Sequence, residues 1–231
     1  GRRIRVGRHP SALLLNADAS RLFVASASTD RVAVVDTRTR RVLTEIHDSP
    51  PGGPGEGSTP SALALSADGT RLFVAETDNN AVALIDWAPV TAGVALAKGE
   101  DQVAGRVPTQ WYPTALLARG DSLITLTGKG RGTQPNPTGV RPGQDRGERD
   151  FDARQYTLGQ TSGSIVTSLL ARAGGTELAE LSARVARANR WGEPRIDAKL
   201  PPFEHVIYIV KENRTYDQVF GDLPQADGDT S

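Results

Sequence analysis

Two adjacent side chains with hard oxygen donors, Glu212 and Asn213, follow an apolar run late in this 231-residue sequence. The run, residues 203–210, is near-continuously apolar from its fourth residue, which predicts a strand buried on both faces. A polar turn follows, and Thr215 and Gln218 then have the spacing of a helix-capping box. A strand, a polar turn and a helix start form the place where α/β enzymes bind ligands. A carboxylate and an amide oxygen are hard donors, suited to Mg²⁺, Mn²⁺ or Ca²⁺, but two such donors do not make a metal site.

The stretch HVIYIVKENRTYDQVFGDL, residues 205–223, resembles the opening of one enzyme family. It is similar to the phosphoesterase family of bacterial phospholipases C and acid phosphatases, within the alkaline-phosphatase-like superfamily. That family has a hydrophobic strand, then Glu-Asn-Arg-Ser/Thr-Phe/Tyr-Asp, then a Gly, which residues 212–217 and Gly221 match. The resemblance implies an α/β domain that hydrolyses phosphate esters with a divalent metal ion. It also implies that Glu212 and Asn213 are metal ligands.

Other readings of these residues stay open. Glu212 could be a solvated turn carboxylate, and Asn213 a turn former that tolerates a left-handed conformation. Thr215 could be the nucleophile, but helix capping explains it better, and we expect the nucleophile beyond the last residue of this sequence. Asp217 falls in the first helical turn, where it suits the helix dipole. His205 opens the predicted strand, so we expect a packed histidine there.

The composition limits the partners and the compartment. Lys plus Arg equals Asp plus Glu, so no basic field predicts binding to nucleic acid. There is no Cys, which excludes disulfides and thiolate metal sites. There is also no Met, and the sequence opens on Gly1. We therefore expect a fragment of a periplasmic or secreted bacterial protein, inactive by itself, whose signal peptide is not included. No apolar run is long enough for a membrane span.

A repeat organises the first half of the chain. Residues 10–36 and 60–86 align without a gap, and 15 of the 27 aligned positions are identical. Each copy predicts three strands joined by tight turns, and residues 41–46 supply a fourth. Four-stranded units at this spacing are typical of propeller blades. We expect Phe23 and Phe73 to occupy equivalent positions between neighbouring blades.

A third, degenerate copy begins at Pro113. Residues 119–121 take the turn position, and residues 128–130, Gly-Lys-Gly, are interpreted as loop because they lack the spacing of a phosphate-binding loop. Residues 131–150 have almost no apolar content and predict a long insertion. One more strand is predicted at 162–168.

A helix is predicted at about 175–190, with Leu178, Leu181 and Val185 on one face. We interpret the arginines late in this helix as a solvated face. The predicted strand at 205–210 should not pair with residues 162–168 as a blade member. Without a sheet of its own it would be exposed.

The repeats resemble the YVTN-type propeller repeats of YncE-like and surface-layer proteins. The fold class predicted is therefore mainly β: a partial β-propeller followed by the first strand, turn and helix of an alkaline-phosphatase-like domain. We assign residues 1–200 to C-terminal blades of the propeller and residues 203–231 to the start of the phosphoesterase domain. The full-length protein would act on a phosphate ester. The alternative is a non-catalytic binding or scaffold propeller with a protein or polysaccharide ligand; a redox-complex subunit is disfavoured because no haem-attachment motif is present.

Overall fold

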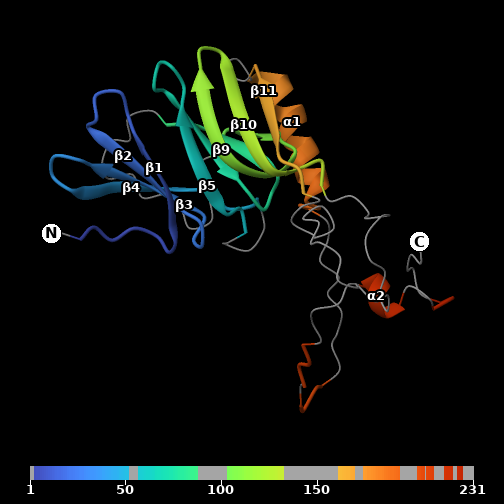
Figure 1. Ribbon diagram of the computed structural model, residues 1–231. Helices are drawn as coiled ribbons and strands as arrows, with labels where there is room; N and C mark the ends of the chain where they lie inside the picture. The colour runs from blue at the N-terminus through green and yellow to red at the C-terminus, as the bar shows by residue number, and fades with distance from the viewer. Residues whose placement is uncertain are drawn as a thin grey trace, which may run out of the picture. The chain divides into compact units, whose positions relative to one another are not determined.

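The chain forms two compact units, Gly1–Thr133 with Thr161–Glu193, and Gln134–Gln160 with Pro194–Ser231. Each unit is described by itself. The computed structural model of the chain describes these residues (Figure 1): 3–51, 57–87, 103–132, 161–169, 174–192, 202–205, 207–210, 216–220 and 223–225.

The first sheet, blade 1, is a four-stranded antiparallel meander. Its strands are β1 (Pro10–Leu15), β2 (Arg21–Ser26), β3 (Arg31–Asp36) and β4 (Arg41–His47), in that spatial order. Tight turns join them, and residues in these turns adopt left-handed conformations, such as Asp30 with φ 45°. Short polar residues tolerate that conformation, which is why the polar clusters of the sequence mark the turns.

The second sheet, blade 2, repeats the first at the predicted offset. It contains β5 (Pro60–Leu65), β6 (Arg71–Glu76), β7 (Ala81–Asp86) and β8 (Gly105–Pro108). The register is also repeated: Leu14 faces Phe23 in blade 1, and Ala64 faces Phe73 in blade 2. Both blades have a register shift just after the opening proline. The prediction that the two copies of the repeat form the same three-strand unit is therefore confirmed.

The third copy forms blade 3, with β9 (Trp111–Arg119), β10 (Ser122–Gly130) and β11 (Ser164–Ser168) in the order β11-β10-β9. The predicted turn is present, with Gly120 at φ 55°. The interpretation of residues 128–130 as loop is wrong, because β10 continues to Gly130, which is paired with Trp111. The long β9 supplies the partner, and a register shift accommodates the glycines. Residues 133–150 of the predicted insertion lie outside the described residues.

Side chains that pack between neighbouring sheets make the core. Phe23 of blade 1 is fully buried in a cluster with Leu63, Leu72 and other residues of blade 2. Phe73 of blade 2 is buried in a second cluster that includes Leu123 of blade 3. The two phenylalanines therefore hold equivalent positions, as predicted. Strand β5 contacts both β1 and β9, so the first strands of successive sheets are neighbours. Three such sheets form a partial β-propeller.

The predicted helix is α1 (Gly175–Ala188), which packs against β8. Its buried residues, Leu178 and Val185, come from the predicted face. Gly105 in β8 permits this packing, since a Cβ there would collide with the side chain of Leu178. The helix therefore covers the fourth strand of blade 2.

In the second unit, residues 207–210 are exposed and belong to none of the described sheets. Among the described strands, β11 pairs with β10. A short helix, α2 (Tyr216–Phe220), begins one residue after Thr215. No helix in the described part of the chain has the length and apolar character that crossing a membrane requires.

Candidate functional site

The predicted metal ligands Glu212 and Asn213 lie outside the described residues, as does Thr215. The described residues beside them are the exposed apolar residues 207–210 and helix α2. In α2 the rings of Tyr216 and Phe220 have centroids 5.2 Å apart. The metal site thus stays a prediction from the sequence, placed between an apolar segment and a helix start.

The chain has three histidines, His9, His47 and His205. His205 is exposed, so the prediction of a packed histidine is wrong. The reason is that the apolar segment following it has no sheet to cover it in the described part of the chain. His9 and His47 lie in blade 1 and its entry. No group of three or more His, Cys, Asp or Glu side chains among the described residues could hold a metal ion.

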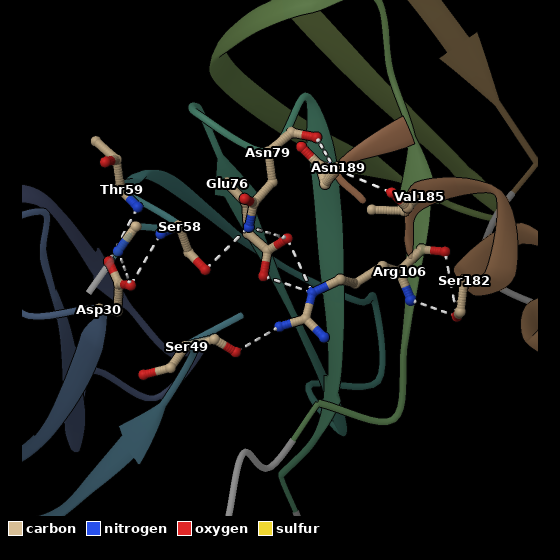
Figure 2. A network of polar contacts seen from close by, with 11 residues as sticks. Asp30, Ser49, Ser58, Thr59, Glu76, Asn79, Arg106, Ser182, Val185 and Asn189 are labelled. Atoms are coloured by element: carbon tan, nitrogen blue, oxygen red, sulfur yellow. Dashed lines mark hydrogen bonds and ion pairs between the residues drawn. The ribbon is translucent and has the colours of Figure 1, made fainter. Parts of the chain in front are cut away.

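A network of polar side chains lies at the junction of blades 1 and 2, where α1 also ends. Figure 2 shows this polar network. At its centre, Nε of Arg106 donates to both carboxylate oxygens of Glu76, at 2.8 and 3.0 Å. The side chain of Glu76 is fully buried and that of Arg106 is 6% exposed. Charged hydrogen bonds of this kind are required where charges are removed from water.

Further hydrogen bonds involve other polar atoms of this ion pair and its neighbours. Nη2 of Arg106 donates to the carbonyl of Ser49, 3.1 Å away in the segment after β4. Asn79 donates to Glu76 at 3.2 Å and to the hydroxyl of Ser58 at 2.9 Å. The pair therefore ties blade 2 to the segment that connects the two blades.

Asp30, in the turn between β2 and β3, fixes the same connecting segment. Its carboxylate accepts hydrogen bonds from the main-chain N–H of Ser58 at 2.8 Å and of Thr59 at 3.0 Å (Figure 2). The repeat places Asn80 at the corresponding position of blade 2, and its side-chain oxygen accepts from the N–H of Tyr112 at 2.8 Å. In blades 1 and 2, one turn residue thus binds the main chain at the start of the next blade.

The end of α1 attaches to this network (Figure 2). Asn189 donates to the carbonyl of Asn79 at 3.0 Å, and the N–H of Arg106 donates to the hydroxyl of Ser182 at 2.8 Å. The guanidinium carbon of Arg106 lies 5.1 Å from the ring centroid of Trp191. These contacts explain how a helix far along the chain is positioned on blade 2.

One more acid, Asp48, is fully buried beside the network. Burial first, and then the charge of Glu76, raises the pKa of Asp48 well above its usual range. The pKa of Glu76 is also raised by burial, which the charge of Arg106 opposes. Because Glu76 is paired with Arg106 directly, we assign the negative charge to Glu76 and the proton to Asp48.

This closed arrangement is a structural junction: its charged groups are buried and engaged with one another, so a substrate cannot reach them. Sequence reasoning missed it because the partners lie in different repeats and in α1. A signal was present, however. Glu76 occupies the position of Ser26 in an otherwise similar repeat, and a charged residue at the end of a buried strand requires a partner.

No protein-family model and no curated protein matches this chain. Among solved structures, hydrazine synthase of Kuenenia stuttgartiensis aligns with a TM-score of 0.41 and 19% identity over 55% of this chain and 32% of that chain. The β-propeller domain of Cps50 (Swd1) from Myceliophteria thermophila aligns with a TM-score of 0.38 and 17% identity over 53% and 34%. A functionally unknown protein of Desulfotomaculum acetoxidans aligns with a TM-score of 0.39 and 14% identity over 54% and 37%.

The chain thus spans about a third of the length of each of these structures. Similarity at this level concerns the fold alone. The partial propeller is assigned from the stacking of the three blades themselves.

Proposed function

We propose that this chain belongs to a periplasmic or secreted protein in which a β-propeller precedes a metal-dependent phosphoesterase domain. The observation that carries the proposal is the sequence of residues 212–217, Glu-Asn-Arg-Thr-Tyr-Asp, which follows an apolar segment and continues into helix α2. The described neighbours support it. Residues 207–210 are apolar, and Ile207, Tyr208 and Ile209 are at least 80% exposed. Such a segment requires a further sheet to bury it. The first strand of an α/β domain has the same requirement.

In the proposed site, Glu212 and Asn213 would bind the divalent cation. The donor set fits a hard cation, since both donors are oxygens and the chain has no thiol. A bound cation polarises a phosphoryl oxygen and offsets the charge that develops in phosphoryl transfer. Glu212 supplies the negative charge that attracts the cation, and Asn213 a neutral donor. Two ligands do not complete a site, so the remaining ligands and the nucleophile are expected from other residues of the full-length protein.

Thr215 has a different role in this proposal. It directly precedes the first residue of α2 in the sequence, so we expect its hydroxyl to cap that helix. Its substitution should therefore affect stability more than catalysis. The two neighbouring positions make a matched pair of variants for one experiment.

The test is hydrolysis of a chromogenic phosphate ester by the full-length protein, with added Mg²⁺, Mn²⁺ or Ca²⁺. We expect Glu212→Gln to lower kcat by about 10²–10³, the usual effect of losing one electrostatic group in an active site. Thr215→Ala should keep substantial activity and lose about 1 kcal/mol of stability. Full activity of Glu212→Gln would refute the metal-ligand assignment. Loss of all activity in a folded Thr215→Ala would identify Thr215 as the nucleophile.

A second candidate is a non-catalytic binding or scaffold propeller with a protein or polysaccharide ligand. The observation that favours it is the junction of blades 1 and 2, whose charged groups are buried and bound to one another. In that case the full-length protein would show no metal-dependent hydrolysis in the experiment above. The same assay therefore separates the two candidates.

A further inference from the structure

Asp48 is held at the blade 1–blade 2 junction by its main chain. It follows β4 directly, and its N–H donates to the carbonyl of Asp30, 2.9 Å away. This bond fixes the residue where its side chain is fully buried. Within the described part of the chain, no hydrogen-bond donor reaches either carboxyl oxygen of Asp48. An ionised carboxylate in that position would be buried without compensation, which is strongly unfavourable.

The charged groups around Asp48 include one cation, Arg106, whose charge opposes the rise in the pKa of Asp48. Three face it: Glu76 from β6, Arg106 from β8 and Asp30 from the turn between β2 and β3. Arg106 is already bound to Glu76 by its Nε, and it donates to Ser49 by Nη2. One guanidinium and two other acids therefore act on Asp48. Glu76 raises the pKa of Asp48 both by its charge and as a hydrogen-bonding partner, so a proton on one acid can be shared by the two.

We propose that Asp48 carries a proton that it donates to Glu76, and that loss of this proton weakens the junction between blades 1 and 2. The junction is then a pH-sensitive latch inside the propeller. Its closed state has one negative charge, on Glu76, opposite Arg106. Its open state is the one in which Asp48 has lost its proton, and a second negative charge then lies in the same buried volume. The charge of Asp30, held by main-chain N–H groups, adds to the repulsion.

The sign of the pH dependence follows from the raised pKa of Asp48. The folded chain keeps this proton at pH values where the unfolded chain has lost it. The contribution to stability is therefore complete below the unfolded pKa, and it is lost as the pH rises through the folded pKa. Between these two pKa values, unfolding releases one proton. The unfolding equilibrium constant therefore rises about tenfold for each unit by which the pH rises. The chain should thus be more stable in mild acid than at neutral pH.

A titration of the 231-residue chain tests the proton directly. The side-chain carboxyl carbon of Asp48 is followed by carbon NMR, and its resonance is assigned by its absence in Asp48→Asn. We expect this carbon to titrate clearly above the range of an ordinary aspartate, whose pKa is about 4. Titration at the ordinary value would overturn the proposal, and this measurement on the wild type does not depend on the variant being stable.

Equilibrium unfolding in urea between pH 5 and pH 8 tests the latch. In the wild type, the unfolding constant should rise with pH while Asp48 loses its proton. Asp48→Asn keeps a donor toward Glu76 but cannot ionise, so its pH dependence should be smaller by up to about tenfold per pH unit. The control is Glu180→Gln, on the exposed face of α1, which should follow the wild type. Equal pH dependence in wild type and Asp48→Asn would refute the latch.

Discussion

At the scale of the residue, the repeat provides an internal comparison for its buried charges. Arg106 in β8 pairs with Ala83, and Glu45 in β4 pairs with Ala33, so the two charged residues hold the same place in their blades. In blade 1, Glu45 binds Arg31 at 2.7 Å, with both side chains at least 32% exposed. In blade 2, Arg106 binds the fully buried Glu76. The same place in the blade therefore carries an exposed ion pair in blade 1, whose loss should cost little stability. In blade 2 it carries a buried ion pair, whose loss should cost much more.

This contrast predicts unequal costs for breaking the two pairs. Arg106→Met leaves Glu76 buried without its cation, and should lower the free energy of unfolding by about 3–5 kcal/mol. Arg31→Met removes an exposed pair and should cost no more than about 1 kcal/mol. The double variant Glu76→Met with Arg106→Met should recover most of the loss. Urea unfolding of the four chains measures this, and equal losses in Arg106→Met and Arg31→Met would contradict the assignment.

At the scale of the element, the sequence predicted the blades well because their signals are local and repeated. The gapless offset predicted β5, β6 and β7 from β1, β2 and β3, and it predicted equivalent positions for Phe23 and Phe73. Helix α1 was predicted from its apolar periodicity. Its attachment to β8 was not, since it depends on Gly105, Ser182 and other residues distant in the sequence. The extension of β10 to Gly130 was missed because glycines indicate loops unless a partner strand continues.

The equivalence of the two phenylalanines gives a prediction for the blade interfaces. Phe23 and Phe73 are each almost fully buried between neighbouring blades. Phe23→Ala and Phe73→Ala should each lower the free energy of unfolding by about 3–5 kcal/mol. Leu117→Ala is the control, because Leu117 lies on the exposed face of blade 3 and its truncation should change stability by about 0.5 kcal/mol or less. If thermal or urea unfolding shows a large loss for only one phenylalanine, the two interfaces are not equivalent.

At the scale of the whole molecule, blade 3 presents an apolar face that no described segment covers. Leu117, Leu126 and Ile165 share this face, as the pairing of β9, β10 and β11 requires. They are 58%, 43% and 73% exposed. The corresponding face of blade 2, with Ala64 and Phe73, is covered by blade 3. In the repeat this face is an interface between blades, so the isolated chain should associate through it.

We therefore predict that polar substitutions on this face reduce self-association. The variant with Leu117→Ser and Ile165→Ser should sediment closer to the monomer than the wild type at the same concentration, since it loses exposed apolar surface. Its stability should change little. A matched pair of substitutions on the exposed side of α1, Glu177→Ser and Glu180→Ser, should leave association unchanged. Unchanged sedimentation of the Leu117/Ile165 variant would show that this face does not drive association.

We propose that the turn after the apolar segment binds a metal ion in a phosphoesterase domain. The most direct measurement is a crystal structure of the full-length protein soaked in Mn²⁺, with the anomalous scattering of the metal recorded. We predict an anomalous peak at about 2.0–2.6 Å from a carboxylate oxygen of Glu212, the bonding range of hard cations, and its loss in Glu212→Gln. A peak far from Glu212, or Glu212 placed in the turn of a further blade, would contradict the account.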